Sequence, residues 1–263
     1  MIRELHEADR QALLNYAYQN ERENLFPIGS LNHSDAFAVN RYFGWFVGEE
    51  LRGIAAVFGR WGSFVIHARE QDVLQAFVDH IVEEKIPFTD IVAFRKFSGP
   101  MVEYLKSAYG REPKKVSEET VYVLERGAFR PAESRAVPAT EEDRDSCARF
   151  DKDHPETPVT EKERARVIPE DVFVIHRDGM LVAKANVQGF SKHFAQIGGV
   201  MTHPSYRRQG CARQCVSALC RYCFSKGVGH VLLFTANTNI PAQNLYTSLG
   251  FKPVDEFLIA EYA

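Results

Sequence analysis

The stretch Arg207-Arg208-Gln209-Gly210-Cys211-Ala212 has the residue types and spacing of an anion-binding turn. It lies between a hydrophobic run that predicts a strand over 194–202 and a run that predicts a helix over 211–226. A glycine in the fourth position lets the backbone come close to a ligand, and the first N–H groups of a helix have no acceptor within it. Because such N–H groups bind anions, the stretch predicts a phosphate cradle.

A second segment downstream gives this cradle a context. The segment Asn239-x-x-Ala242-x-x-Leu245-Tyr246-x-x-x-Gly250-Phe251 follows a predicted strand over 230–234. Together, the two segments resemble the acetyl-CoA site of the GNAT N-acetyltransferases. The resemblance implies that acetyl-CoA is the cosubstrate and that it enters between the 194–202 and 230–234 strands, which separate in that family.

The resemblance also assigns residues to the parts of acetyl-CoA. The backbone of the cradle is expected to hold the pyrophosphate, with charge added by Arg208 and Arg213, and the strand end before His203 is expected to pair with the pantetheine arm. The amide of Asn239 is expected to meet the cofactor, with Asn237 as a second candidate. The predicted cofactor-binding residues are Val200, Met201, Thr202, Arg207, Arg208, Gln209, Gly210, Cys211, Ala212, Arg213 and Asn239.

Tyr246 is the predicted catalytic residue. In the family it resembles, a phenol in this place lies near the sulfur of CoA and can give a proton to the departing thiolate. A tyrosine at helical spacing can also be plain packing. The paired glycines Gly198-Gly199 predict a bulge or a close backbone approach in the strand beside the cofactor.

A general base is not evident in the sequence. Relatives that acetylate protein amino termini carry a glutamate five residues before the asparagine, where this chain has Phe234. The apolar residue favours a different substrate. The remaining candidates for accepting the proton of the amine are His154, Glu156 and His193.

Four of the five cysteines fall within the predicted helix over 211–226. A closed zinc site needs four converging ligands, usually from separate elements, so we expect no metal site here. Free cysteines are often buried, and these are expected to pack the helix against a sheet. Cys211 differs because it lies in the cradle, but no chemical role is assigned to its thiol.

The two halves of the chain resemble each other at a separation of about 140 residues, which indicates duplication. Residues 101–110 align with 241–250, and the strand-like run 91–94 aligns with 231–234. We therefore predict two tandem GNAT-like domains, 1–127 and 134–263, joined by a polar linker over 126–134. The fold class is α/β (α+β), each domain having a mixed, mostly antiparallel sheet flanked by helices.

Within the second half, the elements are expected in the order ββββαβαβ. The dipeptide Asp178-Gly179 predicts a tight hairpin between strands over 171–176 and 180–187. Thr140 followed by acidic residues predicts a helix start, with the helix running to about Phe150. Three prolines between 155 and 169 predict a mobile loop or broken helix that covers the substrate.

The first half departs from the cofactor pattern. At its cradle it has His67-Ala-Arg-Glu-Gln-Asp72, without a glycine and with carboxylates where phosphate would bind. Lys106 stands opposite Tyr246, and Gly99 stands opposite Asn239. We expect this half to bind no acetyl-CoA and to shape the acceptor pocket or support the fold. The aromatic segments 42–46 and 58–61 could line that pocket, although core strands explain them as well.

Composition limits the partners. A net charge of −3 over 263 residues and a pI of about 6.3 give no pull toward nucleic acid or a membrane surface. The start of the chain carries charges where a signal peptide has an apolar core, and no apolar run reaches the ~20 residues of a membrane span. A cytoplasmic protein acting on a small molecule is expected, with its oligomeric state open.

These features predict an N-acetyltransferase that transfers the acetyl group of acetyl-CoA to the amine of a small molecule by direct attack. Two alternatives stay open. One is a non-catalytic protein that binds acyl-CoA and has a regulatory role, since fold resemblance does not exclude it. The other is a protein acetyltransferase, which requires an open groove across the site.

Overall fold

The computed structural model describes residues 1–150 and 158–262, and these form two compact units. Unit 1 consists of residues 1–121, 234–238 and 254–263, and unit 2 of residues 122–233 and 239–253. The end of each half of the sequence therefore belongs to the unit that the other half mainly forms. The last residues of the chain pack in unit 1, although most of the second half forms unit 2. The division into 1–127 and 134–263 stays a prediction about the halves of the sequence.

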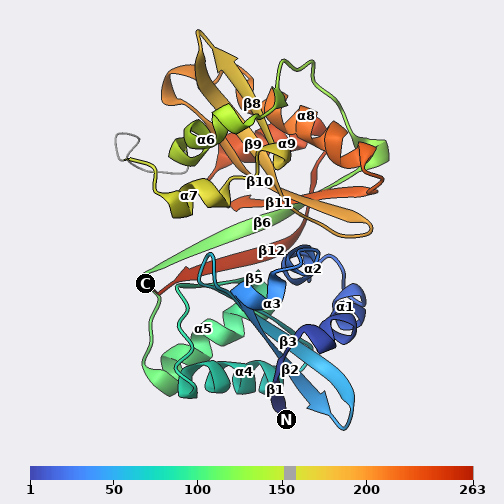
Figure 1. Cartoon of the computed structure of the whole chain (residues 1–263), viewed down its shortest axis with the longest axis vertical. Coiled ribbons are helices and arrows are strands. Elements are labelled where there is room, and N and C mark those ends of the chain that lie inside the picture. Colours follow the sequence, from blue (N-terminus) through green and yellow to red (C-terminus); the bar gives the residue numbers. More distant parts are fainter. Residues whose placement is uncertain (151–157, 263) are drawn as a thin grey trace. The chain divides into compact units, whose positions relative to one another are not determined.

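Unit 1 begins with a strand, three short helices and an antiparallel hairpin (Figure 1). Its elements are β1 (Ile2–Leu5), α1 (Arg10–Tyr18), α2 (Leu25–Leu31), α3 (Ala36–Val39), β2 (Asn40–Val47), β3 (Glu50–Phe58), β4 (Ser63–Ala68), α4 (Gln71–Glu83), β5 (Asp90–Phe94), α5 (Arg95–Tyr109) and β6 (Lys115–Glu125). Its hydrogen-bonded strand order is β1-β2-β3-β4-β5-β12-β6, in which β12 (Lys252–Glu261) comes from the end of the chain.

The helices of unit 1 cover both faces of its sheet. Apolar side chains of α1, α2 and α3 form one core with β2 and β3, in which Leu13, Ile28 and Tyr42 are buried. Helix α4 packs on the other face, where Val73 and Phe77 approach Gly53 of β3. The aromatic segment 42–46 supplies core side chains, whereas Trp61 of the second segment is 55% exposed.

Unit 2 repeats the same succession of elements. It contains β7 (Val137–Pro138), α6 (Arg144–Phe150), α7 (Glu161–Arg166), β8 (Val172–Arg177), β9 (Met180–Phe190), β10 (Phe194–Thr202), α8 (Cys211–Ser225), β11 (His230–Ala236) and α9 (Ile240–Leu249). With β12, the order in the second half is βααβββαβαβ. It agrees with the predicted ββββαβαβ from β8 onward except at the start, where β7 precedes the two helices and only three strands precede α8. Its strands are ordered β6-β11-β10-β9-β8-β7, since the end of β6 belongs to unit 2.

The pairing of strands confirms the predicted fold class. Strand β10 pairs antiparallel with β9 and parallel with β11, and β4 pairs antiparallel with β3 and parallel with β5. The remaining pairs for which a register is given are antiparallel. Each sheet is therefore mixed and mostly antiparallel, with helices on it.

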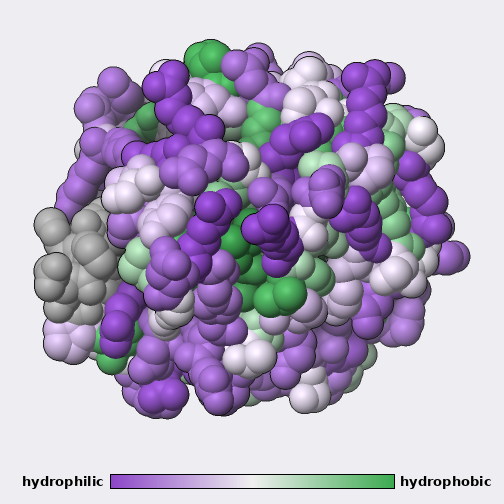
Figure 2. Space-filling view, turned by 90° about the horizontal axis from the view of Figure 1, so that it is seen from above, coloured by the Kyte–Doolittle hydropathy of each residue, from purple (hydrophilic) through white to green (hydrophobic). Residues whose placement is uncertain are grey.

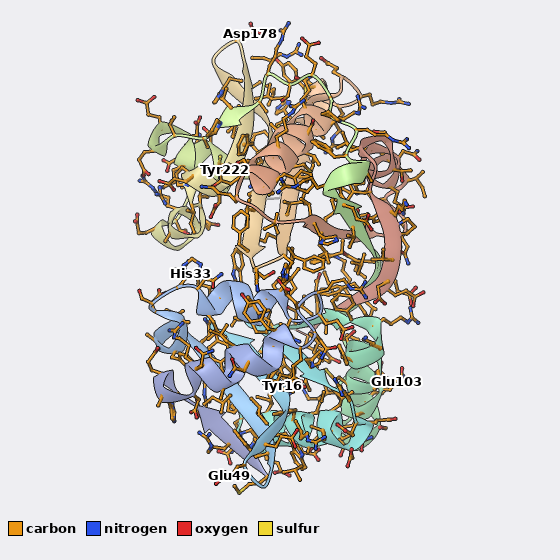
Figure 3. The ribbon with its side chains drawn as sticks, turned by 90° about the vertical axis from the view of Figure 1, so that its right-hand side faces the viewer. Tyr16, His33, Glu49, Glu103, Asp178 and Tyr222 are labelled. Atoms are coloured by element: carbon orange, nitrogen blue, oxygen red, sulfur yellow. The ribbon has the colours of Figure 1, made fainter. Side chains whose placement is uncertain are left out.

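Local sequence signals set several element ends. The hairpin of β8 and β9 turns at Asp178 and Gly179, whose φ angles of 52° and 74° fit the tight turn predicted from these residue types (Figure 3). Thr140 begins the helical segment before α6, and Asp143 accepts hydrogen bonds from the N–H and hydroxyl of Thr140. The proline-rich region contains α7 and a short 3-10 helix, Pro169–Asp171, so its described part is a broken helix.

Helix α8 packs against unit 2 through one apolar stripe. Cys211, Cys215, Leu219, Cys220 and Cys223 recur at helical spacing and are at most 1% exposed. They pack with β8, β9 and β10, so the predicted packing role of the cysteines is confirmed.

The predicted linker is held against α8. Arg126 donates to the carbonyl oxygens of Phe224 and Val228 at 2.6 and 2.8 Å. Ala132 donates its N–H to Ser217 Oγ at 2.9 Å. The polar composition that predicts a linker therefore corresponds to a segment hydrogen-bonded along unit 2.

A quarter of the residues are charged, and many of them lie on the surface. One face of the molecule is mostly hydrophilic, with small hydrophobic areas between the charged side chains (Figure 2). No helix formed by the described residues combines the length and the apolar character needed to cross a membrane.

Candidate functional site

The candidate site lies where two parallel strands of unit 2 separate. The register of β10 with β11 covers only Phe194–Gln196 and His230–Leu232. Beyond it, β10 continues to Thr202 and β11 to Ala236. The strands run parallel, so their carboxyl ends, the start of α8 and the start of α9 meet at the same edge of the sheet. The gap predicted between these strands is present.

A bulge shapes β10 beside this gap. Gly198 lies opposite Asn186 and Met201 opposite Lys184, so two residues of β10 face one residue of β9 between these pairs. Gly199 adopts a φ of 55°, and a Cβ atom there would lie 1.9 Å from Oδ1 of Asn186. The bulge predicted from the paired glycines is therefore confirmed, and the close approach at Gly199 is made by a side chain rather than by a backbone.

The predicted cradle forms the turn into α8. Gly210 is the residue before the helix and has a φ of 79°, while Arg208 has a φ of 62°. The first helical hydrogen bond runs from the N–H of Gln214 to Gly210 O at 3.0 Å. The N–H groups of residues 211–213 thus precede the first intrahelical bond, as anion binding at a helix start requires.

The arginines around the cradle differ in their contacts. Arg207 donates from Nε to Thr202 O at 3.3 Å, which ties it to the end of β10. Arg213 donates from Nε to Ser248 Oγ at 3.1 Å and so connects the start of α8 to α9. Arg208 is exposed at the turn. All three arginines are exposed, and Arg207 and Arg213 also hydrogen-bond to neighbouring elements.

The side chains of Cys211 and Thr202, two predicted cofactor-binding residues, differ in what they can offer a polar ligand. The side chain of Cys211 is 1% exposed within the apolar core, so only its backbone belongs to the cradle. Oγ1 of Thr202 is buried and has no hydrogen-bond partner among the described residues. An unsatisfied buried hydroxyl at the end of β10 fits a site that takes a polar ligand.

Asn239 is the residue before α9, and its Oδ1 accepts the N–H of Ala242 at 3.2 Å. The side chain therefore caps the helix, and its Nδ2 group is the donor left for a cofactor. Asn237 belongs to unit 1, where it accepts a hydrogen bond from Thr120 Oγ1 at 2.7 Å. This difference supports Asn239 over Asn237.

Tyr246 lies two turns into α9 and is 5% exposed. Its ring packs 6.2 Å from the ring of Tyr122 and 5.8 Å from that of Phe251. The packing contacts that a helical tyrosine commonly makes are thus present. They hold the ring in place, and a catalytic role rests on its hydroxyl group alone.

Of the three candidates for the general base, His193 is the one that the structure describes. His154 and Glu156 lie outside the described residues. His193 lies before β10, at the end remote from the cradle and roughly 30 Å from Thr202 at about 3.3 Å per strand residue. His193 is therefore placed away from the separated strand ends.

Phe234, which stands where some relatives have a glutamate, lies in unit 1. Its ring stacks on the ring of Phe257, with 4.3 Å between the ring centroids.

The equivalent strand gap in unit 1 contains a buried polar network. Strands β4 and β5 pair only over Ser63–Phe64 and Asp90–Ile91. His67, at the end of β4, is 3% exposed and lies 2.9 Å from the hydroxyl of Tyr16 and 3.0 Å from Oε2 of Glu23. Oε1 of Glu23 accepts a hydrogen bond from Lys96 at 2.6 Å. This polar network thus lies at the strand end that corresponds to the gap in unit 2.

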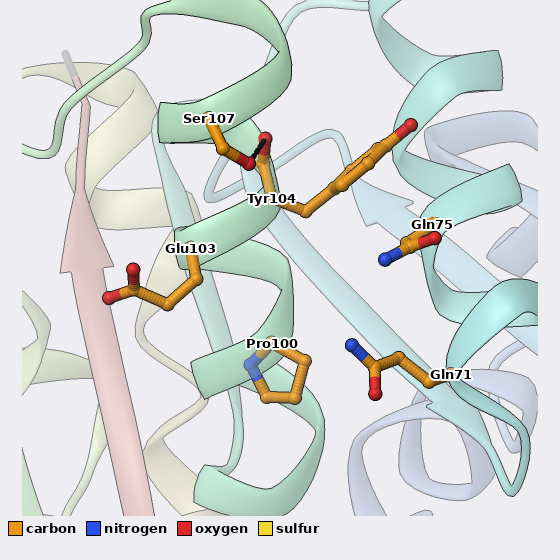
Figure 4. Close-up of a pocket in the computed structure, with 6 residues that line it drawn as sticks. All are labelled: Gln71, Gln75, Pro100, Glu103, Tyr104 and Ser107. Carbon is orange, nitrogen blue, oxygen red and sulfur yellow. Dashed lines mark hydrogen bonds between the residues drawn. The ribbon is translucent and has the colours of Figure 1, made fainter.

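A groove of about 420 Å³ also lies in unit 1, between α4 and α5 (Figure 4). Its lining residues are Gln71, Gln75, Pro100, Glu103, Tyr104 and Ser107. None of them belongs to the predicted site.

The segment of the first half that aligns with the cradle lacks a residue in the left-handed conformation, since Glu70, the residue before α4, has a φ of −93°.

One group of polar residues beside the gap is not among the residues predicted for the site. Lys184, a lysine only 3% exposed, lies opposite Met201, and Gln196 of β10 is also 3% exposed. The signal was available, because Lys184 and Asn186 interrupt an otherwise apolar strand. Among the described residues, no cluster of three or more histidine, cysteine or acidic side chains is arranged to bind a metal ion.

Comparison with known families identifies part of the chain. Residues 137–251 match the sequence model of the acetyltransferase (GNAT) family. No curated protein matches the chain significantly. The matched residues include the cradle, the separated strands and Tyr246.

Solved structures of similar fold cover nearly the whole chain. A Drosophila protein shares 14% identity over 98% of both chains with a TM-score of 0.69. A GCN5-related N-acetyltransferase from Sphaerobacter thermophilus shares 17% identity over 98% of this chain and 94% of its own, with a TM-score of 0.63. A tandem GNAT protein from the clavulanic acid biosynthesis pathway shares 14% identity over 100% and 99%, with a TM-score of 0.62. At these identities the likeness is one of fold.

Proposed function

Because residues 137–251 belong to the acetyltransferase (GNAT) family, we propose that the chain is an acetyl-CoA-dependent N-acetyltransferase that acts on the amine of a small molecule. The family uses acetyl-CoA, which places the enzyme among the acyltransferases.

The observation that carries the proposal is the early end of the pairing between β10 and β11. Its last pair is Gln196 with Leu232, and α8 starts at the same edge with Gly210 in a left-handed conformation. An extended ligand that enters such a gap can pair with the exposed backbone of Val200–Thr202. Its phosphates can then reach the N–H groups at the start of α8.

The proposed mechanism relies on positioning rather than on strong acid–base chemistry. Acetyl-CoA supplies an acyl group activated as a thioester. The backbone of β10 orients this group, and the Nδ2 of Asn239 and the cradle hold the rest of the cofactor. As the amine attacks the thioester carbon directly, the C–S bond breaks and the hydroxyl of Tyr246 gives a proton to the departing sulfur. The proton that the amine nitrogen loses passes to water, and water restores the Tyr246 hydroxyl. No covalent intermediate with the protein forms.

The test is incubation of the purified chain with acetyl-CoA and a panel of small amines. We expect CoA thiol release that depends on the amine, together with an acetylated amine detected by mass spectrometry. The Gly210→Asp variant, which places a carboxylate in the cradle, should lose most of the activity. Tight binding of acetyl-CoA without transfer to any amine would favour a non-catalytic acyl-CoA-binding protein.

Transfer to peptides but not to small amines would favour a protein acetyltransferase instead. Phe234 supports the small-molecule reading, because its place is apolar and its ring stacks on Phe257 at 4.3 Å. Intact-mass measurements of peptide substrates under the same conditions separate these outcomes.

A further inference from the structure

A row of polar side chains lies on one face of β9 and β10 in unit 2. Lys184, Asn186 and Gln188 alternate along β9, so they point to the same face of the sheet. Lys184 lies opposite Val174 of β8, and Asn186 lies opposite Val172. The row therefore shares the face of these two valines.

This face is the one that α6 covers. Val172 and Val174 pack with Cys147 and Ala148 of α6. The neighbouring residues of β9, Ala183 and Ala185, instead belong to the core beneath α8, on the opposite face. The polar row thus interrupts a surface that is otherwise built from valine, leucine and alanine.

The row is buried at Lys184 and Gln196, half-buried at Asn186 and exposed at Gln188, and its own hydrogen bonds organise part of it. Lys184 and Gln196 are each 3% exposed. Gln196 donates from Nε2 to Gln188 Oε1 at 2.9 Å, and Asn186 donates from Nδ2 to Val187 O at 3.2 Å. Burying polar and charged groups costs free energy that their partners must offset, so a buried lysine and a buried glutamine on an apolar face point to a function.

The row adjoins the segment of β10 that is separated from β11. Asn186 lies opposite Gly198 and Lys184 opposite Met201, which brings the Cβ atoms of Lys184 and Met201 to within about 5 Å of each other. At the glycines, the amides of Gln188 and Asn186 occupy the space that a Cβ atom on Gly198 or Gly199 would take. The polar groups therefore reach β10, the strand expected to hold the pantetheine arm of acetyl-CoA.

We propose that this row binds the acceptor and that Lys184 binds an anionic group on it, so that the acceptor is an amine that also carries a carboxylate or phosphate. The inference rests on the proposed acetyl transfer. Its basis is charge: of the four side chains Lys184, Asn186, Gln188 and Gln196, one is a cation and none is an acid. An ammonium carries three N–H donors, so an anionic group can share Lys184 with another partner. Burial strengthens the attraction.

The test compares matched amines with wild type and three variants. Acceptors are amino acids, their carboxamides, their decarboxylated amines and phosphoethanolamine, with acetyl transfer followed by CoA release. We expect wild-type kcat/KM to be about ten- to hundred-fold higher for the anionic members, as for hydrogen bonds to charged groups. Lys184→Met, close in size, should remove this preference, Lys184→Arg should keep part of it, and Lys252→Met, at an exposed position, should leave it unchanged.

The outcomes separate this inference from the proposed function. Transfer to neutral amines without a preference for anionic ones would overturn the inference and leave acetyl transfer standing. An equal loss for all acceptors in Lys184→Met, or a loss of acetyl-CoA affinity, would also overturn it. No transfer to any member of the panel would overturn both.

Discussion

A Cβ atom on Gly199 would lie 1.9 Å from Oδ1 of Asn186. The two residues belong to neighbouring strands, and the φ of Gly199 is 55°, in the left-handed region. Both the close contact and the backbone conformation require glycine. The bulge of β10 is therefore built around this pair.

Replacing Gly199 with alanine should destabilise unit 2. We expect Gly199→Ala to lower the free energy of unfolding by about 2–4 kcal/mol, since the left-handed backbone and the overlap with Asn186 both cost free energy. Urea unfolding followed by circular dichroism measures this. Gly179→Ala is the control: its φ is 74°, but no atom lies within 4 Å of the added Cβ. Equal losses in both variants would contradict a role for the Asn186 contact.

Gly210 should matter for cofactor binding more than for stability. Nothing lies within 4 Å of a Cβ on Gly210, so Gly210→Ala costs only the left-handed strain, about 1 kcal/mol. The added methyl group would project into the cradle, and we expect the Kd for acetyl-CoA to rise at least about ten-fold, or 1.4 kcal/mol. Gly227→Ala, at the other end of α8 with a φ of 97°, tests strain without the cradle. Calorimetric titration that finds equal affinities for the two variants would remove Gly210 from the site.

Tyr246→Phe should separate packing from chemistry. The ring contacts with Tyr122 and Phe251 remain, so folding and acetyl-CoA affinity should change little. Turnover should fall by roughly one to three orders of magnitude, the range of general acid catalysis. Steady-state CoA release gives the result, and Tyr122→Phe provides a buried phenol as the control. A larger loss in the control would move the proton donor to Tyr122.

The Glu23 carboxylate should make unit 1 sensitive to acid. Burial raises the pKa of Glu23, but hydrogen bonds from His67 and Lys96 outweigh it and lower the pKa to about 2 from 4.5. Because the folded-state pKa lies below the unfolded one, the stabilisation is full above about pH 4.5 and is lost as the pH falls toward 2. Glu23→Gln should lose about 1–3 kcal/mol at pH 7 and converge with wild type near pH 2.

Chemical denaturation of wild type and Glu23→Gln between pH 7 and pH 2.5 checks this expectation. Glu118→Gln is the matched control, because Glu118 forms an exposed ion pair with Arg95. A difference between wild type and Glu23→Gln that stays constant with pH would show that the charge of Glu23 does not stabilise unit 1.

Local signals in the sequence were sufficient for several elements of the second half. The turn at Asp178-Gly179, the strand over 194–202 and the helix from Cys211 were all predicted with nearly the observed bounds. Each depends on neighbours in the chain: a turn needs particular φ angles, and an amphipathic helix needs a regular apolar stripe. The cradle glycine could be recognised for the same reason.

Long-range pairing decided the rest. β12 pairs with β5 in unit 1, although it follows α9 of unit 2, and residue types alone do not state which sheet accepts a strand. Likewise, Lys184 could be read as a surface lysine until the register placed it opposite Met201 and beneath α6. The sequence by itself determined the family signature and the local elements, because these depend on residues close in the chain. Only the tertiary structure decided the strand exchange and the polar row, because both depend on which distant segments pair.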